Sequence, residues 1–135
     1  RPGRAFSLVA CIVDHGIRPA GQGVSEIAFA RQLCGGLQVP LIVKTVPPGE
    51  CALRARAAHR SLEEQARDLR HGLLREAAGA SGAAAVSLGH TQDDLIETLL
   101  MRVMQGSDTH GLRGIPARRG PFLRPLLGCT RKQVL

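Results

Sequence analysis

The sequence predicts an α/β fold built on a parallel sheet. Three apolar runs at 5–16, 39–48 and 84–88 alternate with segments that have helical periodicity. Strands that alternate with helices favour a parallel sheet, because each crossover between parallel strands needs a covering element. The 135 residues, 44% of them hydrophobic, are enough for one domain with its own core.

Each predicted strand has its own local signature. The run AFSLVACIVDHG is almost continuously apolar, which is typical of a strand buried on both faces. The run VPLIVKTVPP is a short strand closed by prolines, and residues 84–88 form a third strand of mostly small residues.

Three helices are predicted by spacing and by their end residues. The first spans 24–36 and stops at Gly35-Gly36. The second begins at Ser61, with Glu64 three positions on as a capping box. The third begins after Thr91, and its predicted buried side is Leu95, Ile96, Leu99, Leu100 and Val103. We expect residues 50–60 to be irregular, 105–128 to be loop, and a further helix to begin within 129–135.

Composition narrows the classes of function. There are three Phe and no Trp or Tyr, so binding of single strands by aromatic stacking is not expected. The four cysteines form no C-x-x-C pair, and they indicate neither a zinc site nor a disulfide framework. We therefore expect a cytoplasmic protein. The apolar run at 6–13 is too short to span a membrane, and no membrane association is expected.

The positive charge is concentrated near the end of the chain. Residues 102–135 contain seven Lys or Arg and one acidic residue, which accounts for +6 of the net charge of +7. Such a segment attracts phosphate backbones, although a basic run is also common on an ordinary solvated surface.

Candidate site residues follow the predicted strands. In open α/β sheets, ligands bind beyond the carboxyl ends of the strands. His15 follows the first strand, and His90, Asp93 and Asp94 follow the third. His15 taken alone has an equally good reading as a structural or solvated histidine.

Two readings of the acidic stretch GHTQDDLIETLLMRV compete. Aspartates at a helix N-terminus are stabilised by its dipole, which accounts for Asp93 or Asp94 as a simple cap. Glu97 lies a full turn inside the helix, on the same face as Asp94, and capping does not explain it. Carboxylates together with phosphate oxygens are the ligands that magnesium prefers, so the functional reading is a magnesium site at Asp94 and Glu97.

Helical phase separates two arginines of the second helix. Arg67 falls opposite the apolar face and is explained as an exposed partner of Glu63. Arg70 falls at the border of that face, where a long side chain can pack its stem and still reach into a cleft. The sequence therefore favours Arg70 as a functional group.

Five stretches together resemble the tRNA(Ile)-lysidine synthases, which are N-type ATP pyrophosphatases. They occur in family order and cover nearly the whole chain: VDHGIRP, SLEEQARDLRH, GHTQDDLIETLLMRVMQGS, HGLRGI and FLRPLL. The acidic block followed by the Gly-Ser turn and R-P-L-L is specific to the family, whereas VDHG alone is weak. The resemblance implies a doubly wound parallel sheet of the adenine nucleotide alpha hydrolase type.

The resemblance also implies an activity and its participants. ATP with magnesium adenylates an anticodon cytidine of an isoleucine tRNA, and free lysine then displaces AMP to give lysidine. Asp94 and Glu97 would serve the magnesium–ATP and lysine region, and Arg70 would contact the nucleotide or the activated base. His15, His90 and Asp93 would line the nucleotide pocket. The basic segment would contact tRNA phosphates through Arg113, Arg118, Arg119 and Arg124.

The family's phosphate-binding signature, S-G-G-x-D-S, is not among these residues. We therefore expect 1–135 to be a partial pyrophosphatase domain, incomplete at its N-terminus. We expect it to be inactive alone. Three outcomes are open for the strands at 7–13 and 84–88, which lack their shared neighbour: they pair directly, a second copy inserts a strand, or the fragment is marginally stable and associates through its open edges. A non-catalytic basic module that binds RNA or a protein is the competing class. A related enzyme that thiolates tRNA cytidine is less favoured, because it would need paired cysteines.

Overall fold

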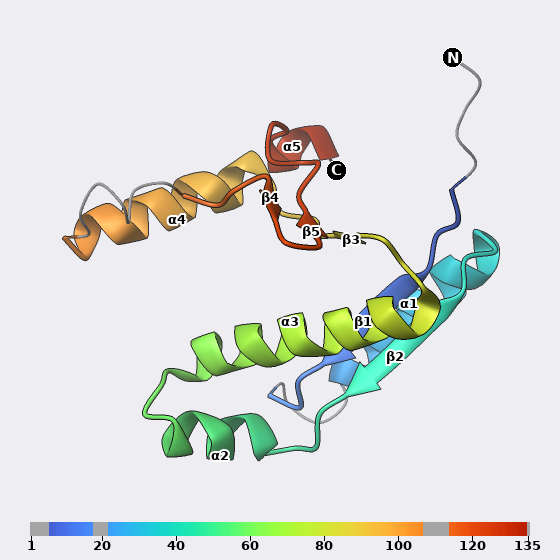
Figure 1. The fold of residues 1–135 in the computed structure, drawn as a ribbon, viewed down its shortest axis with the longest axis horizontal. Helices are drawn as coiled ribbons and strands as arrows, with labels where there is room; N and C mark the ends of the chain where they lie inside the picture. The colour runs from blue at the N-terminus through green and yellow to red at the C-terminus, as the bar shows by residue number, and fades with distance from the viewer. Residues whose placement is uncertain (1–5, 18–21, 107–113, 135) are drawn as a thin grey trace. The chain divides into compact units, whose positions relative to one another are not determined.

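The computed structural model describes residues 6–17, 22–106 and 114–134. The chain divides into two compact units, Arg1–Ala83 and Ala84–Leu135 (Figure 1). Helices and parallel strands occur in both units, in agreement with the predicted α/β class.

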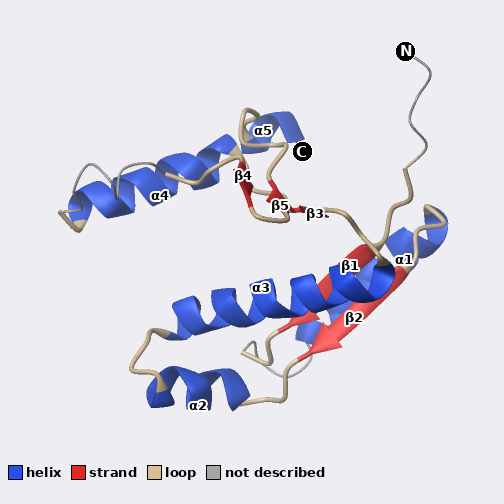
Figure 2. Ribbon diagram, in the orientation of Figure 1, coloured by secondary structure: helices blue, strands red, loops and turns tan. Residues whose placement is uncertain are grey.

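The first unit begins with a strand–helix–strand motif. Strand β1 (Ala10–Asp14) pairs in parallel with β2 (Leu41–Thr45), with Ala10 opposite Leu41 and Asp14 opposite Thr45. Helix α1 (Gln22–Gly36) connects the two strands and contacts both of them (Figure 2). The predicted first two strands and the helix between them are confirmed.

The prediction of irregular structure at 50–60 is wrong, because helix α2 spans Glu50–Ala57. Gly49 lies before it with a φ of 82°, which redirects the chain after two prolines. Cys51 and Ala55 are one helical turn apart and are 1% and 5% exposed. Two small buried residues are a weak periodic signal, and the basic residues around them obscured it.

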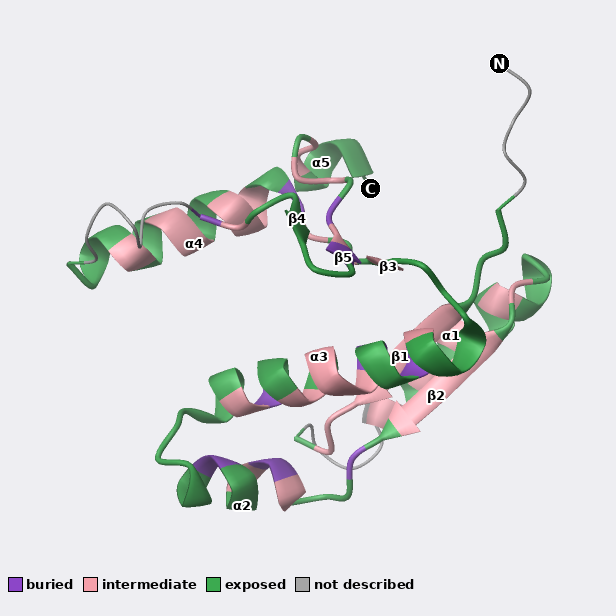
Figure 3. Cartoon of the chain, viewed as in Figure 1, coloured by how far each residue is buried: buried purple, intermediate pink, exposed green. Residues whose placement is uncertain are grey.

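Helix α3 (Leu62–Ser81) begins with the predicted capping box. The Glu64 N–H donates to Ser61 Oγ at 3.2 Å, and the Ser61 N–H donates to Glu64 Oε2 at 3.2 Å. The buried residues of α3 are Ala66, Leu74 and Ala77, whereas Leu62 at its start is 39% exposed. Figure 3 shows the buried residues of α2 on the side that faces α3.

The second unit contains two strands where loop was expected. Strand β3 (Val86–Ser87) pairs in parallel with β5 (Phe122–Leu123), which pairs antiparallel with β4 (Arg118–Arg119). Gly120, with a φ of 58°, turns the chain between β4 and β5. Two-residue strands have too little periodicity to be predicted. Phe122 of β5, which lies opposite Val86 and Arg119, is 2% exposed.

Helix α4 (Gln92–Met104) confirms the predicted helix after Thr91, and α5 (Arg131–Val134) confirms the predicted final one. The chain at Gly114 packs against the side of α4 that carries Leu95 and Leu99. A Cβ atom on Gly114, which has a φ of 67°, would lie 2.6 Å from Leu95 Cδ1 and 3.3 Å from Leu99 Cδ2. The rest of the predicted buried side is exposed, at 49% for Ile96, 58% for Leu100 and 60% for Val103.

The four cysteines are free thiols, and Cys51 is the buried one. Burial raises the pKa of the Cys11 thiol, and the charge of Lys44 opposes this effect. None of the helices in the described part of the chain combines the length and apolar character needed to cross a membrane.

Candidate functional site

The second carboxylate of the acidic stretch, Asp94, is part of the helix start. Thr91, the N-cap residue of α4, is 6% exposed. Asp94 Oδ2 accepts hydrogen bonds from the Thr91 N–H at 2.6 Å and from the Thr91 hydroxyl at 2.9 Å. The capping interpretation is therefore correct for Asp94, but it concerns only one of its two oxygens.

These hydrogen bonds set the charge state of Asp94. The Thr91 N–H, followed by the Thr91 hydroxyl, holds the pKa of the Asp94 carboxyl below its usual range. Partial burial of the carboxyl opposes these hydrogen bonds, and the charges of Arg131 and then His90 make smaller contributions that lower the pKa. Asp94 is therefore ionised at neutral pH and offers a fixed negative charge at the start of α4.

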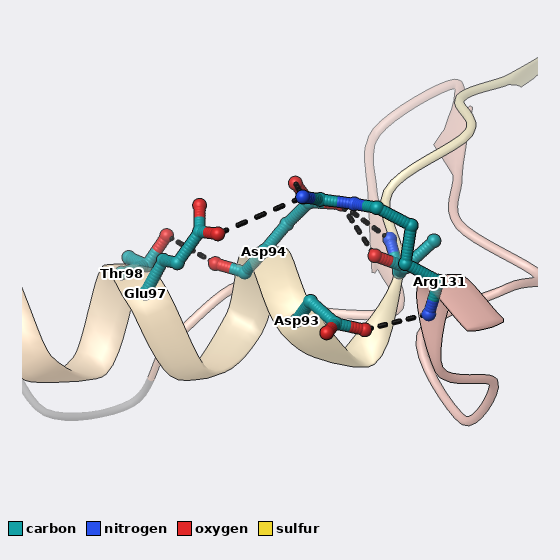
Figure 4. A network of polar contacts seen from close by, with 6 residues as sticks. Asp93, Asp94, Glu97, Thr98 and Arg131 are labelled. Atoms are coloured by element: carbon teal, nitrogen blue, oxygen red, sulfur yellow. Dashed lines mark hydrogen bonds and ion pairs between the residues drawn. The ribbon is translucent and has the colours of Figure 1, made fainter.

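The carboxylates of α4 converge on Arg131, at the start of α5. Arg131 Nη2 lies 3.3 Å from Asp94 Oδ1 and 3.6 Å from Glu97 Oε1 (Figure 4). Asp93 Oδ2 accepts a hydrogen bond from the Arg131 backbone N–H at 2.6 Å. Glu97, which capping could not explain, thus shares a cationic partner with Asp94.

Sequence reasoning missed Arg131, because it counted this residue only as part of the basic segment. The available signal was an arginine near the start of the helix predicted within 129–135. The carboxylates of 93–97 lie at the start of another predicted helix. That signal does not specify a partner 37 positions away. Only the folded chain brings the two helix starts together.

The Asp94–Glu97 pair has the donor type that magnesium requires, but not equally at each residue. Both Asp94 oxygens already accept hydrogen bonds or an ion pair, whereas Glu97 Oε2 takes part in none within the described residues. Glu97 is therefore the better oxygen donor. The described residues contain no group of three or more His, Cys, Asp or Glu that could hold a metal without further ligands. A magnesium ion here would need oxygens from its nucleotide, as magnesium usually does.

Two other predicted residues meet in the first unit. The Arg70 Nε–H donates to His15 Nε2 at 3.2 Å. The preference for Arg70 over Arg67 is consistent with this contact, since Arg70 reaches the carboxyl end of β1.

The loop at the end of β1 explains part of the VDHG stretch. The Gly16 N–H donates to Asp14 Oδ1 at 3.0 Å, and Gly16 has a φ of 62°. A Cβ atom on Gly16 would lie 2.8 Å from the Val46 carbonyl oxygen. Gly16 therefore lets the chain turn tightly where the ends of β1 and β2 lie side by side, and His15 lies in this turn.

The remaining predicted nucleotide ligand, His90, lies in the loop between β3 and α4, one position before Thr91. The structure thus brings together Asp93, Asp94 and Glu97 in the second unit, and His15 and Arg70 in the first.

The four arginines predicted to contact tRNA differ in exposure. Arg118 and Arg119 are exposed on β4, at the edge of its sheet. Arg124 is 7% exposed, and its Nη1 donates to the Pro116 carbonyl at 3.0 Å. A buried guanidinium that supports the chain is poorly placed to reach a phosphate, so the structure does not favour Arg124. Arg113 lies outside the described residues.

The PP-loop domain family matches residues 2–135, which is nearly the whole chain. The chain therefore belongs to the PP-loop domain family. Membership in this family agrees with the α/β fold, in which His15 follows β1 and Asp93 and Asp94 follow β3.

Three similar proteins share the name tRNA(Ile)-lysidine synthase. The chain is 38% identical to the one from Treponema pallidum, over 93% of this chain and 27% of that protein. It is 37% identical to the one from Symbiobacterium thermophilum, over 99% of this chain and 28% of that protein. For Thermus thermophilus the identity is 37%, over 93% and 24%. The chain thus spans about a quarter of the length of these curated relatives.

Proposed function

We propose that this chain supplies part of the nucleotide-binding domain of a tRNA(Ile)-lysidine synthase. The reaction joins lysine to an anticodon cytidine of an isoleucine tRNA. ATP first adenylates the cytidine, releasing pyrophosphate. The lysine amine then forms the new carbon–nitrogen bond as AMP leaves. The observation that carries the proposal is the convergence of Asp94 and Glu97 on one cation, Arg131.

The chemistry assigns roles to the acidic residues. The lysine amine is protonated at neutral pH and must lose a proton before it can attack. An ionised carboxylate can hold the ammonium form and then accept its proton. Glu97 is the stronger candidate, because its side chain is 63% exposed and Oε2 remains open within the described residues, whereas Asp94 also caps the helix. Asp94 contributes a constant negative charge beside it.

Binding of the nucleotide would use the same two carboxylates together with further residues. When bound with ATP, magnesium neutralises phosphate charge, and Asp94 and Glu97 are the residues that would hold it. Arg70 would contact the nucleotide or the activated base through the guanidinium nitrogens that His15 does not use. His15, His90 and Asp93 would border the nucleotide.

Lysidine formation tests the proposal directly. The complete gene product would be incubated with isoleucine tRNA, ATP, magnesium and labelled lysine, and the tRNA analysed by mass spectrometry. Glu97→Gln should lower lysine transfer at least about tenfold with little effect on thermal stability, because an exposed side chain contributes little packing. Glu63→Gln, at an exposed site on α3, is the matched control. Lysine transfer that is unchanged in Glu97→Gln would contradict the assigned role.

A non-catalytic RNA-binding module is the second candidate, favoured by the exposed Arg118 and Arg119 on β4. Such a module would bind tRNA without consuming ATP. Release of pyrophosphate that depends on tRNA separates the two candidates, because only the enzyme produces it. Absence of this release in the complete gene product would favour the binding module.

A further inference from the structure

Arg131 contacts the acidic start of α4 at two separate points. Its backbone N–H is held by Asp93 Oδ2 at 2.6 Å. Its guanidinium lies 3.3 Å from Asp94 Oδ1 and 3.6 Å from Glu97 Oε1 (Figure 4). The backbone contact fixes where the side chain starts, and the guanidinium then meets two carboxylates at once.

The exposure of the paired side chains indicates whether these ion pairs stabilise the fold. The side chains of Arg131 and Glu97 are 54% and 63% exposed. Ion pairs this exposed contribute little to stability. One nitrogen atom nevertheless serves both carboxylates, and it therefore directs Asp94 Oδ1 and Glu97 Oε1 toward a common point. The ion pairs of Arg131 are therefore expected to contribute little to folding.

We propose that Arg131 is a positioning residue that holds the Asp94 and Glu97 carboxylates in the orientation required for lysine transfer. The inference rests on the proposed function of this site. Arg131 acts through the two carboxylates and contacts no reacting atom. By occupying Glu97 Oε1, it leaves Oε2 as the oxygen available to substrate.

An alternative role for Arg131, as a stand-in for a substrate cation, predicts a different kinetic effect. If Arg131 merely filled the place of a substrate cation, its removal would open that place, and Arg131→Ala would lower the KM for lysine or tighten magnesium binding. A positioning role requires kcat to fall instead, since the carboxylates lose their shared orientation.

The kinetic test uses Arg131→Ala and Arg131→Lys in the complete gene product. At saturating tRNA and ATP, Arg131→Ala should lower kcat for lysine transfer by roughly tenfold or more, and Arg131→Lys should recover part of the loss. In a Glu97→Gln background, Arg131→Ala should cause little further loss, because the two residues act as one unit. Additive losses, a lowered KM for lysine, or a change confined to the KM for tRNA would each overturn the proposal.

A second measurement does not depend on activity. The titration of Asp94, followed by carbon-13 NMR of selectively labelled protein, should shift to higher pH in Arg131→Ala. Lys132→Ala, one position along and also exposed, removes the same charge without this ion pair and should leave the Asp94 titration unchanged. An unchanged titration in Arg131→Ala would overturn the ion pair itself. Failure of the wild-type protein to form lysidine would instead refute the proposed function and, with it, the kinetic role of Arg131.

Discussion

Asp94 illustrates how one side chain can be both a structural and a chemical group. Its Oδ2 satisfies the N–H and hydroxyl of Thr91, and its Oδ1 faces Arg131. The capping and functional interpretations of the acidic stretch are therefore compatible, because they use different oxygens of the same carboxylate. Glu97 has no such local duty, so it is the cleaner residue for testing function.

Asp94 should make the stability of α4 depend on pH. Because its folded pKa is lowered, ionised Asp94 stabilises the helix above the pKa of an unfolded aspartate, about 3.9. This contribution is lost as pH falls through the folded pKa. At pH 7, Asp94→Asn should lower the free energy of opening of α4 by about 1 kcal/mol, a typical capping loss. The difference from wild type should shrink toward zero in acid.

Amide hydrogen exchange of α4, corrected for intrinsic rates, measures this free energy in the complete gene product. Thr91→Ala provides a second variant, since it keeps the carboxylate but removes one of its two local donors. It should reproduce the direction of the effect. A difference between wild type and Asp94→Asn that stays constant from neutral pH into strong acid would argue against the assigned hydrogen bonds.

The strand ends show a second kind of constraint, in which a backbone position requires glycine. Gly16 combines a φ of 62° with a Val46 carbonyl oxygen 2.8 Å from where a Cβ would lie. Gly16→Ala should therefore destabilise the protein by more than about 1 kcal/mol, since the left-handed conformation alone costs alanine ~1–2 kcal/mol. It should also displace His15 from Arg70.

Thermal unfolding measures the effect of Gly16→Ala, and Gly79→Ala is the matched control. Gly79 lies within α3, and a Cβ there would meet nothing within 4 Å. Alanine is the better helix former by about 0.5–1 kcal/mol, so Gly79→Ala should be neutral or stabilising. Equal effects of the two substitutions would show that the turn at Gly16 tolerates a side chain.

Strand β4 has the exposed charge expected of an RNA-binding surface. Arg118 and Arg119 are adjacent in the edge strand, whereas Arg124 is buried. The double variant Arg118→Ala/Arg119→Ala should weaken tRNA binding and reduce its dependence on salt, by a slope of about 0.7–0.9 for each phosphate that is no longer neutralised. Fluorescence anisotropy of labelled tRNA across a salt series provides the measurement. Binding by the wild-type protein that is flat with salt would indicate another mode of recognition.

At the scale of the whole chain, the described residues of the first unit form a sheet of two strands. Strand β1 pairs with β2, and no other described strand pairs with its second edge. All five residues of β1 are half-buried, although its apolar sequence is typical of a strand covered on both faces. An unpaired edge of this kind favours association with another chain. Pairing or strand exchange between copies accordingly stays a prediction.

Nucleotide binding by the 135 residues alone is the corresponding functional prediction. Backbone N–H groups that cradle phosphates come from a glycine-rich loop, and S-G-G-x-D-S is not among these residues. Calorimetric titration of the chain with magnesium–ATP should therefore show no binding in the low micromolar range. A low-micromolar dissociation constant would demonstrate that Arg70, His90 and Asp94 are sufficient.

The sequence by itself determined the features that depend on neighbours within about one helical turn. The capping box at Ser61 and Glu64, the start of α4 after Thr91, and the parallel strands around α1 follow from local spacing. The acidic stretch belongs to the same class, and with the other motifs it indicated the family that the comparison supports. Local propensity and periodicity carry this information, because they act before distant segments meet.

Only the tertiary structure decided which distant groups pair. The ion pairs of Arg131 with Asp94 and Glu97 and the hydrogen bond from Arg70 to His15 join residues 34 to 55 positions apart. The parallel pairing of β3 with β5 and the burial of Arg124 likewise depend on where the chain returns. A charge or a two-residue strand is compatible with many partners in sequence, and it acquires one only when packing excludes the others.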